Sequence, residues 1–73
     1  MGKAGGLITN DIRLLRLRHA QMTQQELADR VGVTRQTVNA IESNKYSPSL
    51  EVAFRIARVF ALPLEQVFHY SED

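Results

Sequence analysis

Apolar residues recur at intervals of three and four along most of the chain, and this spacing predicts α-helices. A first helix is expected from Asn10, with Ile12 and Leu15 on one face. Residues 1–9 are rich in glycine and have no helical period, so they are predicted to form a flexible N-terminal tail. No stretch stands out as having the alternating pattern of a β-strand.

The segment MTQQEL, residues 22–27, predicts the start of a second helix. Thr23 and Glu26 have the spacing of a capping box, in which each side chain accepts a hydrogen bond from the other residue's backbone N–H. Met22 and Leu27 are placed to form the hydrophobic staple that often accompanies such a box. Gly32 is expected to end this helix, because glycine readily adopts the left-handed backbone found at helix C-termini.

The segment VTRQTVNAIESNK, residues 33–45, predicts a third helix directly after the second. Thr34 is its expected cap, Val38 and Ile41 point to the core, and Asn44 ends it in a left-handed conformation. Two short helices joined by a turn of about three residues that contains glycine are the signature of a helix-turn-helix.

The rest of the chain predicts two more helices. Ser49 caps a fourth helix, which should end at Leu62 because Pro63 disfavours a helical residue before it. A short fifth helix is expected at about residues 64–68, and residues 70–73 form a polar C-terminal tail. The predicted fold class is therefore all-α, a compact five-helix domain over residues 10–69.

Composition excludes several kinds of site. The 73 residues include no cysteine, which rules out disulfides and thiolate zinc sites. The two histidines, His19 and His69, are far apart in the sequence, so neither a metal site nor a cofactor is expected. Without paired carboxylates, a nucleophile–base set or a phosphate loop, the chain is not expected to be an enzyme. It has no apolar run of the ~18 residues that a membrane span needs and no signal-peptide core, so a cytoplasmic protein is expected.

Charge is distributed unevenly along the chain. The net charge is +1, but residues 1–45 carry seven Lys or Arg against four acids, and residues 46–73 carry two against four. The positive half contains the helix-turn-helix. This asymmetry agrees with nucleic-acid binding, although charged residues usually serve only to solvate a surface.

The outward side of the third helix carries side chains that suit DNA recognition. Arginine can pair with guanine O6 and N7, glutamine or asparagine with adenine N6 and N7, and a small residue lets the helix approach the bases. A polar helix face can also be plain solvated surface. The well-defined helix-turn-helix around this face favours the DNA-reading interpretation. Its residues are Arg35, Gln36, Asn39, Ala40 and Ser43.

The stretch from Met22 to Phe68 closely resembles the helix-turn-helix regulators of the phage repressor and Cro type, the XRE-like family. The resemblance extends over about residues 10–68. It implies a five-helix DNA-binding domain that acts as a homodimer on a palindromic operator, with the helix from Arg35 to Glu42 in the major groove.

Carried over by position, the resemblance implies two groups of DNA contacts. Gln24 is the first residue of its helix, where free backbone N–H groups attract a phosphate. Ala40 replaces a longer side chain of several phage repressors, so direct readout should rest on Arg35, Gln36 and Asn39. The base-reading candidates are Arg35, Gln36, Thr37, Asn39 and Ala40. The phosphate-binding candidates are Gln24, Thr34, Ser43, Asn44, Lys45 and Tyr46.

Two further roles are expected. Glu42 resembles a family acid that pairs with an arginine of the first helix, and Arg16 or Arg13 is its candidate partner; a catalytic role is disfavoured, since an acid facing phosphate would weaken DNA binding. Apolar residues near the C-terminus exceed what the small core needs, which predicts a dimer interface, with extra core packing as the alternative. These residues are Phe54, Leu64, Phe68 and Tyr70.

The sequence thus predicts a sequence-specific regulator of transcription, a repressor that binds double-stranded DNA as a homodimer and needs no small-molecule effector. Two alternatives stay open. One is an antitoxin-type regulator that binds a toxin and its own operator. The other is a protein-interaction module that has lost DNA binding.

Overall fold

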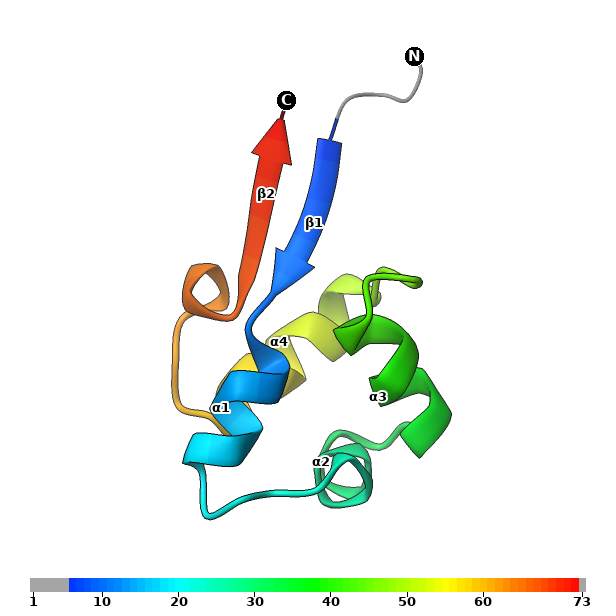
Figure 1. Ribbon diagram of the computed structural model, residues 1–73, viewed down its shortest axis with the longest axis vertical. Coiled ribbons are helices and arrows are strands. Elements are labelled where there is room, and N and C mark those ends of the chain that lie inside the picture. The colour runs from blue at the N-terminus through cyan, green and yellow to red at the C-terminus, as the bar shows by residue number, and fades with distance from the viewer. Residues whose placement is uncertain (1–5, 73) are drawn as a thin grey trace.

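The computed structural model describes residues 6–72. They form four helices, a short 3₁₀ turn and a two-stranded sheet made by the two ends of the chain (Figure 1). The helix-turn-helix is formed by α2 and α3. In chain order the elements are β1 (Gly6–Asn10), α1 (Ile12–Arg18), α2 (Gln24–Val31), α3 (Arg35–Glu42), α4 (Leu50–Val59), η1 (Leu64–Gln66) and β2 (Phe68–Glu72).

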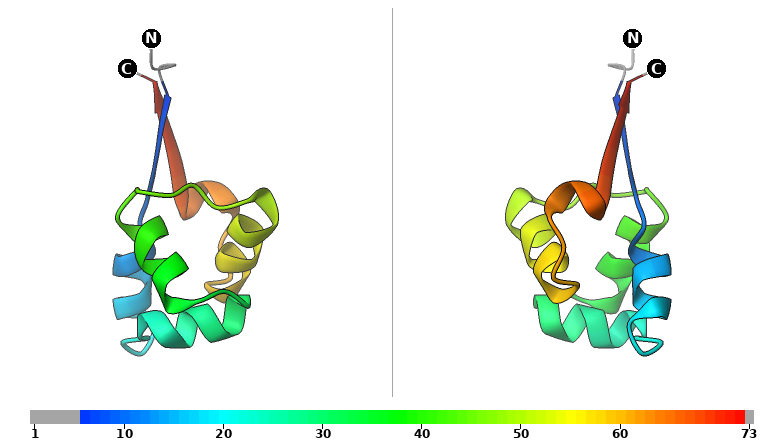
Figure 2. Two further views of the ribbon diagram at one scale, coloured as in Figure 1. Left: turned by 90° about the vertical axis from the view of Figure 1, so that its right-hand side faces the viewer. Right: turned by 90° about the vertical axis from the view of Figure 1, so that its left-hand side faces the viewer.

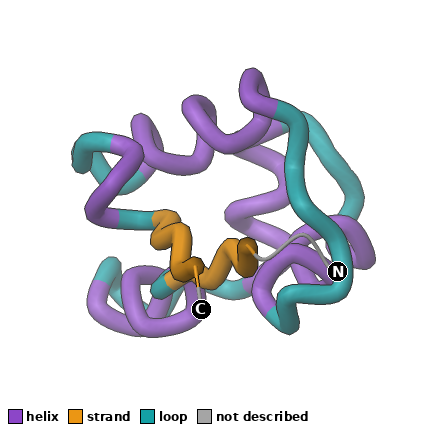
Figure 3. Tube along the Cα trace, turned by 90° about the horizontal axis from the view of Figure 1, so that it is seen from above, coloured by secondary structure: helices purple, strands orange, loops and turns teal. Residues whose placement is uncertain are grey.

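The helices enclose one apolar core, and the two strands rise from it at one end of the molecule (Figures 1 and 2). Seen from above, the helices lie around the core and the strands run side by side (Figure 3). Every helix contributes at least one fully buried side chain to this core. Its buried members are Ile12, Met22, Leu27, Ala28, Val31, Val38, Ile41, Ile56, Ala57, Phe60 and Val67.

The predicted helix caps around the turn are confirmed. Thr23 Oγ1 accepts from the Glu26 N–H at 3.0 Å, and Glu26 Oε1 accepts from the Thr23 N–H at 2.8 Å. Thr34 Oγ1 accepts from the Thr37 N–H at 3.1 Å. Gly32, with φ +89°, and Asn44, with φ +62°, both adopt the left-handed conformation. Local side-chain chemistry therefore sets both ends of α2 and α3.

The prediction of an all-α fold is wrong at the two ends of the chain. Strands β1 and β2 pair antiparallel, with Ile8 opposite Tyr70 and Asn10 opposite Phe68. Residues 6–9 and 70–72, which were expected to be tails, belong to these strands. Each strand pairs with a strand at the opposite end of the chain. No local sequence pattern therefore predicts this pairing. Residues 1–5 and 73, also predicted as tail, lie outside the described residues.

Three helix boundaries also differ from expectation. Helix α1 begins at Ile12 rather than Asn10, because Asn10 is the last residue of β1. Helix α4 ends at Val59, before a left-handed Ala61 with φ +57°. The expected fifth helix is a single 3₁₀ turn, and after it the Val67 carbonyl accepts from the Asp11 N–H at 3.0 Å. Within the described residues, no helix is long and apolar enough to cross a membrane.

Candidate nucleic-acid interface

Helix α3 turns one side to the core and the other to solvent, as its sequence predicts. Val38 and Ile41 are buried, whereas Arg35, Gln36 and Asn39 are exposed. Two other candidates for base contact, Thr37 and Ala40, are half-buried at the edges of this outward side. The five base-reading candidates thus lie together on one helix, and the longest of them extend freely from its first half.

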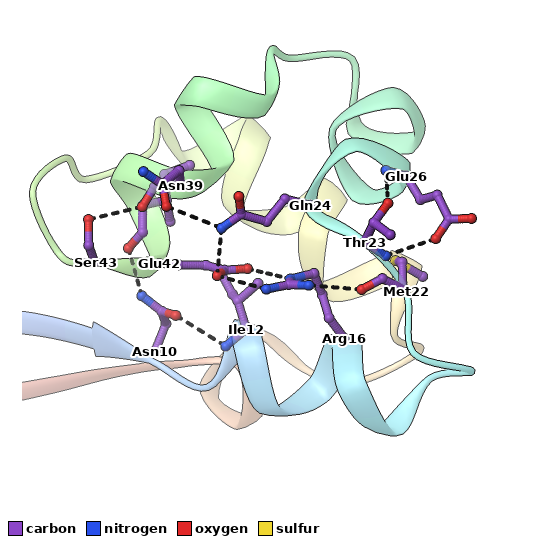
Figure 4. A network of polar contacts seen from close by, with 11 residues as sticks. Asn10, Ile12, Arg16, Met22, Thr23, Gln24, Glu26, Asn39, Glu42 and Ser43 are labelled. Carbon is purple, nitrogen blue, oxygen red and sulfur yellow. Dashed lines mark hydrogen bonds and ion pairs between the residues drawn. The ribbon is translucent and has the colours of Figure 1, made fainter.

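An ion pair anchors α3 to α1 (Figure 4). Arg16 binds both carboxylate oxygens of Glu42, with Nε–Oε2 at 2.5 Å and Nη2–Oε1 at 3.0 Å. Its remaining nitrogen, Nη1, donates to the Met22 carbonyl at 2.8 Å. Arg16 is therefore the partner of Glu42, and Arg13, the other candidate, is exposed. This pairing neutralises the only acid of α3 inside the protein.

Gln24, at the start of α2, extends this network to the outward side of α3. Its amide Nε2 donates to Asn39 Oδ1 at 3.2 Å and to Glu42 Oε1 at 3.0 Å (Figure 4). The side-chain amide of Gln24, a predicted phosphate-binding residue, is thus already engaged within the protein. A phosphate at this place would have to compete for it or use the backbone N–H groups that the start of a helix leaves free. The same bonds fix the amide of Asn39.

The remaining phosphate-binding candidates fall into two groups. Thr34 caps α3, Ser43 Oγ donates back to the Asn39 carbonyl at 2.9 Å, and Asn44 Oδ1 accepts from Asn10 at 3.1 Å. These side chains already have partners within the protein. Lys45 and Tyr46, by contrast, are exposed in the loop after α3. Arg35, on the outward side of α3, and Lys45, in the loop after it, are both exposed positive charges.

Asn10 is a residue of this region that sequence reasoning missed. Its Oδ1 accepts from the Ile12 N–H at 3.1 Å (Figure 4). Its Nδ2 donates to the Ile41 carbonyl at 2.9 Å and to Asn44 Oδ1 at 3.1 Å. It therefore joins the end of β1 to the end of α3. No local sequence signal identifies this role, because it depends on β1 lying beside the loop after α3.

The four residues predicted to form a dimer interface divide by burial. Phe54 and Tyr70 are exposed, whereas Leu64 and Phe68 are half-buried and pack against the core. The alternative of extra core packing therefore applies to Leu64 and Phe68, and the dimer interface stays a prediction. Of the two histidines, His19 lies edge-on to Phe60 and His69 Nε2 contacts Asp11 Oδ2 at 2.9 Å. Among the residues that the structure describes, no group of acids and histidines could hold a metal ion.

Comparison with known proteins places the chain in a family. A family model described as helix-turn-helix matches residues 12–67. An uncharacterised HTH-type transcriptional regulator of Methanocaldococcus jannaschii is 45% identical over 64 residues, which cover 88% of this chain and 96% of that protein. A cryptic phage CTXphi transcriptional repressor, RstR, of Vibrio cholerae is 30% identical over 66 residues, covering 90% of this chain and 59% of the repressor.

A solved structure agrees with these matches. The crystal structure of a putative DNA-binding protein from Bacteroides fragilis superposes with a TM-score of 0.73 at 27% identity, over 86% of this chain and all of that chain. The fold and the outward side of α3 define a helix-turn-helix DNA-binding domain. The chain belongs to the XRE-type helix-turn-helix family and is a transcriptional regulator.

Proposed function

We propose that the protein is a repressor that reads a palindromic operator in the major groove of double-stranded DNA, with α3 as its recognition helix and as a homodimer. The observation that carries this proposal is the outward side of α3. There, Arg35, Gln36 and Asn39 are exposed, while the acid of the same helix, Glu42, is neutralised by Arg16. Repression would follow from occupancy, because a bound dimer covers promoter DNA.

The candidate contacts divide into base readers and phosphate binders. Arg35 and Gln36 lie in the first turn of α3, and in docked helix-turn-helix proteins the N-terminal residues of the recognition helix contact base edges. Asn39 is oriented by Gln24, so its amide would meet a base in a fixed orientation. Lys45 and Tyr46, in the exposed loop, would contact the backbone and add affinity for any sequence. Thr37 and Ala40 would contact bases at close range.

The antitoxin and protein-interaction alternatives are less well supported. A protein-interaction surface is expected to have apolar or acidic residues on the outward side of α3, and Arg35, Gln36 and Asn39 are neither. The similarity to a protein named as a phage repressor favours repression. If α3 binds DNA, a toxin partner would have to bind a surface other than the outward side of α3.

Selection of bound sequences from random duplex DNA tests this function. We expect a two-fold symmetric consensus for the wild type. The double variant Arg35→Ala, Gln36→Ala should lose preference at one or two positions in each half-site, whereas Lys45→Ala should keep the consensus and bind it more weakly. If the double variant selects the wild-type consensus, α3 does not read the bases and the assignment is wrong.

A further inference from the structure

Two side-chain amides join the helices of the helix-turn-helix at the edge of the polar network. Gln24 is half-buried at the start of α2, and Asn39 is exposed in the second half of α3. Gln24 Nε2 donates to Asn39 Oδ1 at 3.2 Å (Figure 4). An amide has a donor end and an acceptor end. The direction of this bond therefore decides which end of Asn39 is left for DNA.

The buried carboxylate of Glu42 sets the direction of the Gln24 amide. Both oxygens of Glu42 accept from Arg16, and a carboxylate paired in this way can only accept. Gln24 lies against the same carboxylate, with Nε2 at 3.0 Å from Oε1. If the Gln24 amide were turned round, its oxygen would meet the carboxylate oxygen with no hydrogen between them. The nitrogen of Gln24 must therefore face Glu42.

The same reasoning extends one step further, to Asn39. An amide nitrogen carries two hydrogens, and Gln24 Nε2 donates one to Glu42 and the other to Asn39. Only an acceptor can meet the second hydrogen, so Asn39 turns Oδ1 toward α2. Within residues 6–72, Asn39 Nδ2 is hydrogen-bonded to no protein group. Both of its hydrogens are therefore available on an exposed side chain.

We propose that Asn39 reads guanine rather than adenine, and that Gln24 is the positioning residue that gives Asn39 this preference. The proposal deepens the proposed function and rests on it, because it requires α3 to lie in the major groove. Guanine is the base whose major-groove edge offers two acceptors and no donor, N7 and O6. These two atoms match the two free hydrogens of Asn39 Nδ2.

Adenine is disfavoured by the same arrangement. The usual pairing of asparagine with adenine needs the amide oxygen to accept from N6 and the amide nitrogen to donate to N7. In Asn39 the oxygen is held by Gln24, so the adenine amino group would meet a second donor. The free oxygen of Gln24 does not replace it, because the first helix of a docked helix-turn-helix crosses the DNA backbone outside the groove.

Positioning of Asn39 and phosphate binding by Gln24 have different consequences for DNA binding. Loss of a phosphate contact weakens the binding of all sequences alike. Loss of positioning changes the preference at one base pair, because an Asn39 amide without Gln24 can turn either end toward the base. The pattern of base preference therefore separates the two roles.

A matched pair of variants on α2 tests the proposal. Gln24→Met keeps the length and the helix propensity of the side chain but has no N–H groups. Gln25→Met is the control, because Gln25 is the neighbouring glutamine and its amide donates to Asp29 of the same helix, at 2.9 Å. Circular dichroism checks that both variants are folded.

Selection of bound sequences from random duplex DNA gives the readout. Asn39→Ala identifies the base pair that Asn39 reads, as the pair whose preference disappears. At that pair the wild type and Gln25→Met should favour guanine over adenine by about 5- to 150-fold, the usual discrimination of a two-bond contact. Gln24→Met should reduce this ratio to within about threefold and leave the preferences at the other base pairs unchanged.

Exchange of side-chain amide protons in the free protein, followed by nuclear magnetic resonance, tests the bond direction without DNA. The Gln24 protons should exchange more slowly than those of Asn39, because both are hydrogen-bonded. Slower exchange at Asn39 would overturn the proposal.

Three results of the DNA selection would also overturn it. One is a wild-type preference for adenine at the Asn39 position, and another is a Gln24→Met variant that binds more weakly but keeps every preference. The third is an Asn39→Ala variant with an unchanged consensus, which would refute this proposal alone. A wild type that selects no consensus would refute the proposed function and the role of Asn39 together.

Discussion

The substitution Glu42→Ala is expected to destabilise the fold by about 3–5 kcal/mol, the usual cost of removing one member of a buried ion pair. The Arg16 and Glu42 side chains are only 10% and 7% exposed. Without Glu42, the guanidinium keeps a single protein partner, the Met22 carbonyl. Its charge would be buried without compensation. For a chain of this length the total stability is about 4–11 kcal/mol, so the loss is a large fraction of the whole.

Two further variants distinguish the effect of losing the Glu42 charge from the effect of losing its side-chain volume. Glu42→Gln keeps the length of the side chain and one acceptor oxygen for Arg16, so we expect a smaller loss of about 1–3 kcal/mol. The double variant Arg16→Met, Glu42→Leu removes both charges and fills the site with apolar groups. Such replacements are often neutral or stabilising, and the double variant should therefore be more stable than Glu42→Ala alone.

Urea unfolding followed by circular dichroism measures these differences. With a slope of about 1 kcal/mol/M for a small domain, the loss of about 3–5 kcal/mol should lower the midpoint of Glu42→Ala by about 3–5 M or leave the chain largely unfolded in water. The difference from the wild type should persist in about 1 M salt, because buried pairs are screened little. A loss below about 1 kcal/mol, or one that disappears at high salt, would show that Arg16 and Glu42 behave as a surface pair.

Three further predictions concern other parts of the molecule. Arg35→Ala should weaken operator binding by about 1–3 kcal/mol and relax the preference at one base position, as measured by binding to single-base operator variants. Lys45→Ala should weaken operator and random DNA alike and reduce the slope of log affinity against log salt by about one, and a loss confined to the operator would contradict this. Ala61→Gly should raise the stability by about 0.5–1 kcal/mol, because Ala61 has φ +57° and glycine adopts this region without steric cost. Thermal unfolding measures that gain, and Ala53→Gly, inside α4, should be destabilising instead.

The centre of the fold could be predicted from the sequence because its signals are local. The capping box of Thr23 and Glu26, the left-handed Gly32 and the cap at Thr34 each act within a few residues. Together they fix where α2 and α3 begin and how the turn between them bends. The helical period then fixes which side of α3 faces outward. The outward side of α3 follows from these facts without knowledge of the tertiary structure.

The sheet could not be predicted because its signals are not local. Each strand has five residues, and neither shows enough alternation to distinguish it from a loop end. The partner of each strand lies at the other end of the chain, with Leu7 opposite Ser71 and Thr9 opposite His69. The sequence did indicate surplus apolar residues at Leu64, Phe68 and Tyr70, but it could not show that Phe68 packs on the core while Tyr70 projects from it.

Local signals and long-range contacts act together on α3. Local caps set where α3 begins and the helical period sets which residues it exposes, but neither fixes how the helix tilts on the core. Arg16 from α1, Gln24 from α2 and Asn10 from β1 each bond to the C-terminal half of α3, from three different directions. A short helix with one polar anchor could pivot about it, whereas three anchors on separate elements define an orientation. The free ends of Arg35 and Gln36 then project from a helix whose position is set by the rest of the fold, which is what reading a base edge by hydrogen-bond geometry requires.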